Sequence, residues 1–221
     1  IAYARDRGIR VVPEFDMPGH LWAWLVAYPE LASLPGPYEP QTDFVKYDDT
    51  ALDPTRESTY RFLDTFVGEM AALFPDKYYH VGGDESRGKQ WLANPRITAF
   101  MAKHNLKTAA ALQTYFESRL LKIVAKHGKH MVGWEEILHS DFSGEQALNP
   151  LPKEVVVEPW HNPDLLLEGA RHGYQMIMSA PYYLNRMYSA EQHYSADPEH
   201  PDTLSQGLWV GSFEEKNYIA D

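Results

Sequence analysis

Three stretches of the chain place apolar residues three and four positions apart, the spacing that predicts amphipathic α-helices. They cover about residues 54–74, 108–127 and a shorter segment at 163–172. Asp53 followed by Pro54 is typical of a helix start, with an aspartate as N-cap and a proline at the first helical position. We therefore expect two long helices and one short helix.

Short apolar runs stand between these helical segments. They are nearly continuous in hydrophobic residues, as expected for strands of a parallel sheet that is covered on both faces. Basic helix ends followed by a glycine lead into three of them, a pattern typical of α-to-β connections. The predicted strands are 10–15, 78–81, 130–133, 154–158 and 175–179.

Strands that alternate with helices predict an α/β fold. Long loops follow predicted strands at 17–52 and 185–221, and this favours a (β/α)8 TIM-barrel, in which function lies on the loops after the strands. A doubly wound sheet is the alternative, but the glycine-rich GxGxxG turn typical of that fold is absent. We read residues 1–221 as part of a single domain.

The composition narrows the classes of partner. The formal net charge is −11, which argues against nucleic acid and anionic membranes, because both need clustered positive charge. Apolar runs stay well short of the roughly 20 residues that span a bilayer. The chain has no cysteine but 6 Trp, 14 Tyr and 9 Phe, a composition compatible with carbohydrate binding.

Every predicted strand ends in a polar or aromatic cluster, and in a barrel these clusters meet at one rim. Gly82 and Gly83 would let the chain leave strand geometry, so that the adjacent Asp84 and Glu85 face one pocket. Their repulsion would raise one of the two pKa values, leaving one acid protonated and the other charged. The clusters are "DMPGH" with Asp16 and His20, "HVGGDE", "GWEE" with Trp134, "EPWH" with Trp160, and "YYLNR" with Tyr183, Asn185 and Arg186.

The strings "VVPEFDMPGH", "HVGGDE", "GWEEI" and "YYLN" resemble glycoside hydrolase family 20, the β-N-acetylhexosaminidases, over nearly the whole chain. The resemblance implies a retaining exo-acting enzyme in which the substrate's own 2-acetamido group is the nucleophile and forms an oxazolinium ion. By resemblance, Asp84 would orient the acetamido group. Glu85 would be the general acid and base, with a raised pKa.

The same resemblance implies substrate-binding roles for further residues. His20 would tune Glu85, Trp134 and Trp160 would wall the acetamido pocket, Tyr183 would bond the acetamido oxygen, and Asn185 would contact sugar hydroxyls. From the residues alone, a structural His20 and two core tryptophans stay open as alternatives. His80 reads as a buried core histidine.

Asn185 followed by Arg186 resembles the subset of the family that accepts a negatively charged 6-substituent, such as a 6-sulfate. A guanidinium near the sugar would favour an anion. The alternative is a surface arginine in a loop salt bridge.

The match to the family pattern is incomplete. About five of eight β/α units are found, and strands expected before residue 1 and after residue 221 are missing. The substrate-binding arginine and the last strand's motif expected of the family are also missing. We therefore expect a piece of a longer protein. An open arc of strands would favour self-association or a complementing chain.

Two other functions stay open. One is a non-catalytic sugar-binding or interaction module. The other is a metal-dependent hydrolase using His20, His80 and Asp84, although no dense ligand motif supports it. No cofactor or metal is expected, and the expected partners are oligosaccharides or glycoconjugates that contain N-acetylhexosamine. Localisation cannot be read, although the resemblance suggests a secreted, periplasmic or lysosome-like compartment.

Overall fold

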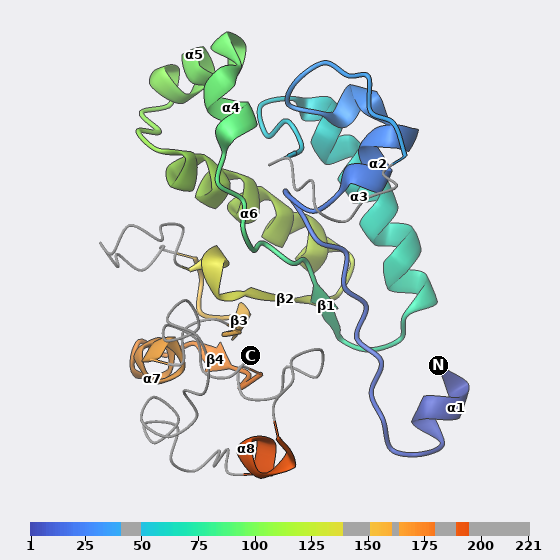
Figure 1. The fold of residues 1–221 in the computed structure, drawn as a ribbon. Coiled ribbons are helices and arrows are strands. Elements are labelled where there is room, and N and C mark those ends of the chain that lie inside the picture. Colours follow the sequence, from blue (N-terminus) through green and yellow to red (C-terminus); the bar gives the residue numbers. More distant parts are fainter. Residues whose placement is uncertain (41–49, 139–150, 161–163, 180–188, 195–221) are drawn as a thin grey trace. The chain divides into compact units, whose positions relative to one another are not determined.

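The computed structural model describes residues 1–40, 50–138, 151–160, 164–179 and 189–194 of the chain (Figure 1). Contacts divide the chain into two compact units. The first unit is Ile1–Met131 with Glu136–Leu151, and the second is Val132–Glu135 with Pro152–Asp221. That all 221 residues form one domain stays a prediction.

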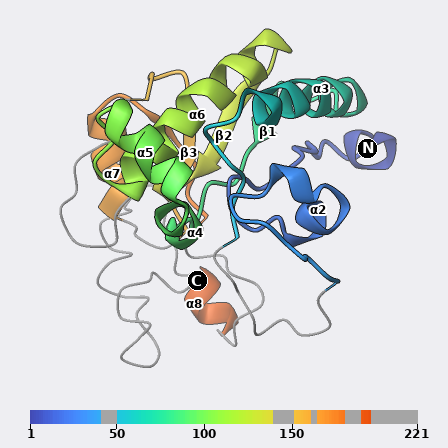
Figure 2. The same ribbon diagram turned by 90° about the horizontal axis from the view of Figure 1, so that it is seen from above.

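Helices dominate the first unit. Its two longest helices, α3 and α6, pack side by side (Figure 2), and the contact includes the rings of Tyr60 and Phe116 at 6.0 Å. The helical elements are α1 (Ala2–Arg5), α2 (Trp22–Ala27), η1 (Pro29–Leu31), α3 (Glu57–Leu73), α4 (Lys89–Ala93), α5 (Pro95–Lys103), α6 (Ala109–Lys126) and η2 (Glu135–Ile137), which straddles both units.

The two long predicted helices are confirmed as α3 and α6. Thr108 caps α6, because its side chain accepts the N–H of Ala111 at 3.1 Å. The cap predicted for α3 is wrong. That helix starts after Arg56, and Asp53 instead accepts the N–H of Thr55 at 2.9 Å, because a fully buried carboxylate needs partners beyond one helix end.

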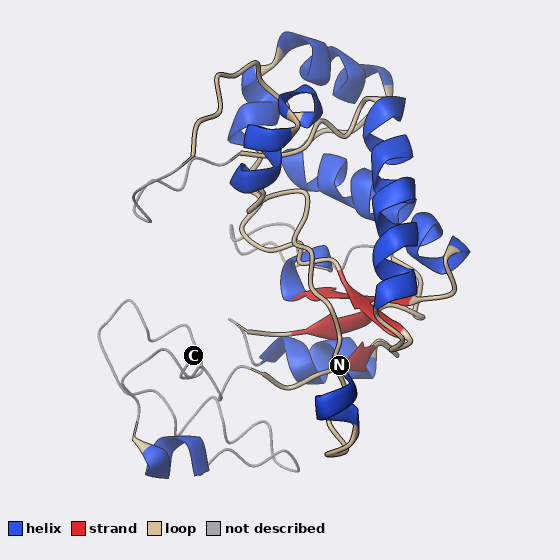
Figure 3. Cartoon of the chain, turned by 90° about the vertical axis from the view of Figure 1, so that its right-hand side faces the viewer, coloured by secondary structure: helices blue, strands red, loops and turns tan. Residues whose placement is uncertain are grey.

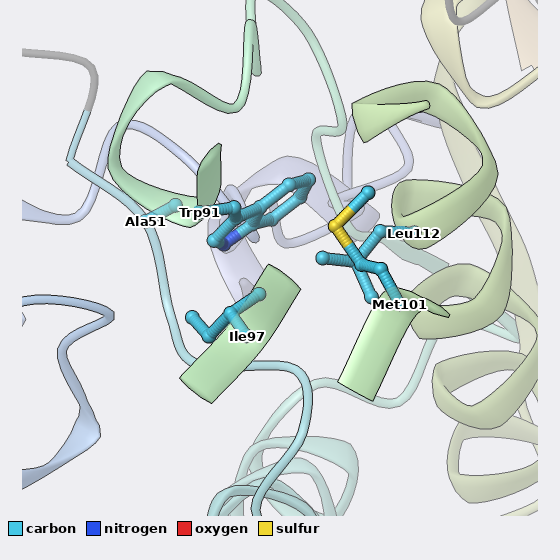
Figure 4. Packing of buried hydrophobic residues seen from close by; sticks show 5 residues of the cluster. All are labelled: Ala51, Trp91, Ile97, Met101 and Leu112. Atoms are coloured by element: carbon cyan, nitrogen blue, oxygen red, sulfur yellow. The ribbon is translucent and has the colours of Figure 1, made fainter. Parts of the chain in front are cut away.

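A hydrophobic cluster holds the short helices α4 and α5 against α6. Trp91 is fully buried at its centre, and its indole N–H donates to the carbonyl of Leu52 at 2.9 Å. This bond ties the loop that precedes α3 to the helical layer. The cluster contains Ala51, Trp91, Ile97, Met101 and Leu112 (Figure 4).

The strands are short, and helices and loops make up most of the described residues (Figure 3). Their order in the sheet is β1-β2-β3-β4, and β2 pairs in parallel with β3, as β3 does with β4. This confirms an α/β fold with a parallel sheet. The strands are β1 (Tyr78–His80), β2 (His130–Trp134), β3 (Val156–Glu158) and β4 (Gln175–Met176).

The strand predicted at 10–15 is wrong as a regular strand. Only an isolated parallel bridge joins Glu14 to His80, because Pro13 has no N–H to donate. Ile9 and Val12 are 58% and 40% exposed, so the apolar run that predicted this strand is only partly buried.

Parallel pairing of β2, β3 and β4 characterises the second unit. Val132 pairs with Val156, which pairs with Gln175, and α7 (Asp164–Arg171) packs against β4. The predicted third helix is confirmed as α7. The unit also contains α8 (Ala190–Tyr194). Among the helices described in either unit, none has the length and apolarity that crossing a membrane requires.

Candidate active site

The segment that carries Asp16 lies alongside β1. The N–H of Phe15 donates to the carbonyl of His80 at 3.0 Å, and the N–H of Met17 donates to the carbonyl of Val81 at 2.9 Å. The two segments run parallel, so both reach the same edge of the sheet. This register places Asp16 beside the glycines that follow β1.

Gly82 and Gly83 are required at this edge for two reasons. Their φ angles are 71° and 103°, which residues with a Cβ rarely adopt. A Cβ on Gly82 would overlap the carboxyl of Asp16, and one on Gly83 would overlap Ile137. The N–H of Gly83 donates to Oδ1 of Asp16 at 3.0 Å, so the turn and the acid hold each other in place.

The structure brings three of the predicted site residues together. Nε2 of His20 lies 3.4 Å from Oδ2 of Asp84 and 3.2 Å from Oε2 of Glu85. His20 and Glu85 both have positive φ, 52° and 51°. Such backbone strain in non-glycine residues concentrates at functional sites.

The proton of this cluster resides on Asp16 and the positive charge on His20. Burial and the neighbouring Asp84 raise the pKa of Asp16 to about 9. Hydrogen bonds to Asp84 and Glu85 raise the pKa of His20 to about 11. At neutral pH the cluster therefore contains one uncharged acid, one imidazolium and two carboxylates.

The prediction that the pKa of Glu85 is raised is wrong for the free site, because the pKa values of both adjacent acids are lowered. Burial opposes ionisation of Asp84, but hydrogen bonds with His20 and Asp16 outweigh it and lower the pKa. The pKa of Glu85 is also lowered, chiefly by the hydrogen bond from His20. The shared imidazolium relieves the repulsion that the sequence suggested.

Asp16 is the functional candidate that the sequence analysis left out of its site residues. It lies beside Asp84, and its pKa is raised while that of Asp84 is lowered, so Asp16 keeps the proton. Oδ1 of Asp84 is buried and has no hydrogen-bond partner among the described residues. A proton on Asp16 gives the pair an O–H donor. The signal in the sequence was an acid at the end of the first apolar run, four residues before His20.

His80 lies behind this cluster as a buried histidine of β1. Its Nδ1 accepts the N–H of Gly82 at 3.0 Å, and burial lowers its pKa to about 4. The neutral ring supports the turn, in agreement with the prediction of a core residue.

The residues with metal-ligand geometry differ from the predicted set. Among the described residues, ligand atoms of Asp16, His20 and Asp84 lie within 4.8 Å of one another, whereas the metal hypothesis named His80 in place of Asp16. A metal needs neutral imidazole and ionised carboxylates. A metal would have to displace the protons of both His20 and Asp16 to bind here.

The two predicted pocket tryptophans belong to the second unit. Trp134 ends β2 and pairs with Glu158. The backbone N–H of Trp160 donates to Oε2 of Glu135 at 3.0 Å, a contact that the sequence analysis did not foresee. Both tryptophans are half-buried. The other three predicted binding residues, Tyr183, Asn185 and Arg186, lie outside the described residues.

The model of the glycosyl hydrolase family 20 catalytic domain matches residues 1–216 of the chain. The chain belongs to glycosyl hydrolase family 20. This confirms the resemblance carried by the "DMPGH" and "HVGGDE" motifs.

Individual relatives agree with membership of family 20. The chain is 35% identical to a beta-hexosaminidase of Porphyromonas gingivalis, over 90% of this chain and 24% of that protein. The structure of Flavobacterium johnsoniae chitobiase matches with a TM-score of 0.77 at 39% identity, covering 97% of this chain and 31% of that one.

A third relative was solved with a sugar. The exo beta-N-acetylglucosaminidase of Vibrio harveyi in complex with N-acetylglucosamine matches with a TM-score of 0.66 at 32% identity, over 80% of this chain and 26% of that one. The family 20 chain described here thus spans about a quarter to a third of the length of these three relatives.

Proposed function

We propose that this chain carries the catalytic residues of a retaining exo-β-N-acetylhexosaminidase. They would lie at the rim of a (β/α)8 barrel, of which residues 1–221 contain about five β/α units. The proposal is carried by the cluster in which His20 faces both Asp84 and Glu85. Membership of family 20 and the N-acetylglucosamine complex of a relative support it.

In this proposal Asp84 acts on the 2-acetamido group of the substrate. Its lowered pKa keeps it ionised, so it can accept the acetamido N–H and stabilise the positive charge that develops there. Holding the acetamido oxygen against the anomeric carbon converts the attack into a favourably oriented intramolecular step.

Glu85 would transfer the protons. As the acetamido oxygen bonds to the anomeric carbon, the glycosidic C–O bond breaks and the leaving oxygen takes the proton of Glu85. The resulting carboxylate then takes a proton from water, whose oxygen attacks the anomeric carbon and opens the oxazolinium ring. Two displacements on opposite faces give net retention.

This role requires Glu85 to gain a proton when the sugar binds. In the free site the hydrogen bond from His20 keeps the pKa of Glu85 low, but 38% of the side chain is exposed. A bound sugar would cover that carboxyl, and loss of water raises the pKa of an acid. Binding and protonation would therefore be coupled.

The remaining predicted roles belong to the same proposal. Trp134 and Trp160 would wall the acetamido pocket, Tyr183 would donate to the acetamido oxygen, and Asn185 would contact sugar hydroxyls. Arg186 would favour 6-sulfated sugars. In that case Arg186→Ala would lower the ratio of activity on sulfated over plain substrate, and an unchanged ratio would refute the role. Self-association or a complementing chain stays part of the proposal.

The decisive experiment is release of p-nitrophenol from p-nitrophenyl β-N-acetylglucosaminide by the full-length protein that carries residues 1–221. Glu85→Gln should lose about 10²- to 10⁴-fold in kcat, the range typical of a lost general acid. The p-nitrophenyl β-glucoside, which lacks the acetamido nucleophile, is the matched control substrate and should be turned over far more slowly. Binding of N-acetylglucosamine without turnover would favour the sugar-binding module instead.

A further inference from the structure

A second pair of buried polar residues lies on α6, behind the turn formed by residues 82–85, called the site turn below. Nε2 of Gln113 donates to the carbonyl of Gly83 at 2.6 Å. Glu117 follows one helical turn later, and its Oε1 would lie 3.6 Å from a Cβ placed on Gly83. The two side chains are 2% and 0% exposed. The peptide groups around Gly83 are therefore held on both sides, by Asp16 at the N–H and by Gln113 at the carbonyl.

Glu117 is an unexpected residue at this position. Neither carboxyl oxygen has a partner of good hydrogen-bond geometry in the described part of the chain, although the amide of Gln113 is close enough to lower the pKa of Glu117. An ionised carboxylate buried without a partner is strongly disfavoured, and burial raises the pKa of Glu117 to about 8, with Gln113 as the opposing influence. The acid is therefore uncharged at neutral pH and charged in mild alkali.

The charge of Glu117 decides how strongly it competes for the amide of Gln113. A neutral carboxyl is a weak acceptor, so the amide stays on the carbonyl of Gly83. A carboxylate accepts hydrogen bonds about twice as strongly as a neutral group, and side chains four residues apart on a helix are neighbours. The amide has two N–H groups, so ionised Glu117 would compete by turning the whole amide toward itself, which would weaken the bond to the carbonyl of Gly83.

Other titratable groups lie on the elements around this part of α6, and those on α3 have partners. On α3, Glu57 pairs with Arg119, Asp64 pairs with Lys126 and His127, and the hydroxyl of Tyr60 donates to the carbonyl of Pro54. The turn and η2 contribute a further set, namely Asp16, His80, Asp84 and Glu136. Gln113 is the side chain that changes the pKa of Glu117.

We propose that Glu117 is a positioning residue that controls the site turn through Gln113. Uncharged, it leaves the Gln113 amide on Gly83 and so holds Asp84 and Glu85 in place; ionised, it takes the amide and loosens the turn. The inference rests on the proposed function for its kinetic test, but not for its structural test.

The kinetic test measures kcat and KM between pH 5 and 10 on p-nitrophenyl β-N-acetylglucosaminide, with the full-length protein. The wild type should lose kcat with a midpoint near pH 8. Glu117→Gln cannot ionise, so it should keep its kcat at pH 6 within about threefold, lack the step near pH 8 and lose kcat only nearer pH 9, where Asp16 releases its proton. Gln113→Met should lower kcat about 10- to 100-fold at every pH with little change in KM, because small misplacements of reacting groups are costly.

Val124→Ala is the matched control, because it removes a buried side chain from the same helix two turns beyond Glu117. It should lower thermal stability and leave kcat and the pH profile unchanged. If Glu117→Gln does not fold, Glu117→Met gives the same comparison. A step near pH 8 that persists in the variant, or a Gln113→Met enzyme with normal kcat, would overturn the proposal.

A structural test separates this inference from the enzyme assignment. The amide nitrogen of Asp84 reports on hydrogen bonding at the carbonyl of Gly83, and its NMR shift should titrate near pH 8 in the wild type but not in Glu117→Gln. A protein without turnover that shows this titration would refute the proposed function and keep the inference. An active protein whose Asp84 amide shift does not titrate near pH 8 would refute the inference and keep the proposed function.

Discussion

Two clusters in the first unit bury aspartates, and they balance the negative charge in different ways. Fully buried Asp53 contacts two guanidinium groups, with Nε of Arg56 at 3.0 Å and Arg96 closer still. At the site turn, one imidazolium is shared among the carboxyls of Asp16, Asp84 and Glu85. The first cluster has enough positive charge, and the second does not.

The shortage of positive charge at the site turn is what gives it chemistry. Burial and the adjacent negative charge of Asp84 raise the pKa of Asp16, and the single imidazolium does not offset them, so the cluster retains a proton on Asp16. A site that holds a proton next to two ionised acids can exchange protons with a ligand. The Asp53 cluster pairs its carboxylate with two guanidinium groups, and we expect it to contribute to stability alone.

The largest effect should come from replacing Asp84 and Asp16, the two neighbouring acids of the site, one at a time. Asp84→Asn removes the charge that stabilises the transition state and should lower kcat about 10³-fold. Asp16→Asn keeps an uncharged hydrogen-bond donor, so its loss should stay below about tenfold. Steady-state kinetics on the p-nitrophenyl substrate measures both. Equal losses in the two folded variants would show that the proton is not held by Asp16.

The next effect should come from breaking the Asp53 cluster. Asp53→Ala leaves two guanidinium groups without their carboxylate. Because these groups are 38% and 48% exposed, water can partly solvate them. The free energy of unfolding should therefore fall by about 2–3 kcal/mol, at or below the lower end of the range for fully buried pairs. Urea unfolding measures this loss. Specific activity per folded molecule should be unchanged, and a fall in kcat at full stability would contradict the contrast.

The pH dependence of stability gives a further test of the proton that the site turn holds. Asp16 has a raised pKa, so the native state holds a proton that the unfolded chain releases above about pH 4. Stability therefore falls as pH rises toward about 9, by up to about 1.4 kcal/mol per pH unit. The raised pKa of His20 acts in the same direction between about 6.5 and 11. Urea unfolding at pH 6 and 9 should show a smaller fall for Asp16→Asn than for the wild type.

The smallest effect should come from a third acid, Glu57, which is 67% exposed and paired with Arg119 at 2.6 Å. Glu57→Gln should cost less than about 0.5 kcal/mol, because solvent screens exposed pairs. Arg119 also keeps its position over the ring of Tyr60 at 3.5 Å. A larger loss of unfolding free energy in urea would mean that solvent exposure does not determine how much each charged cluster contributes to stability.

The sequence predicted the parts that depend on local pattern. Apolar periodicity located α3 and α6, and the motif around Gly82 and Gly83 located Asp84 and Glu85. It did not show which acid keeps the proton, because that depends on burial and on a partner 68 positions away in the chain, Asp16 for Asp84. Glu117 was also missed, because a polar residue on a helix usually indicates a solvent-facing position.

The segment that carries Asp16 and His20 has a consequence for the order in which the protein would unfold. It is joined to β1 by three backbone hydrogen bonds, and Phe15 packs on the rings of Phe66 and Tyr79 while Met17 is fully buried. Apolar burial therefore holds this segment more than its short ladder does, and we expect it to detach before the packed helical pair separates. Detachment would remove the proton reservoir and the imidazolium in one event while α3 and α6 stay folded. Heat would then abolish catalysis before it erases the helical circular dichroism signal.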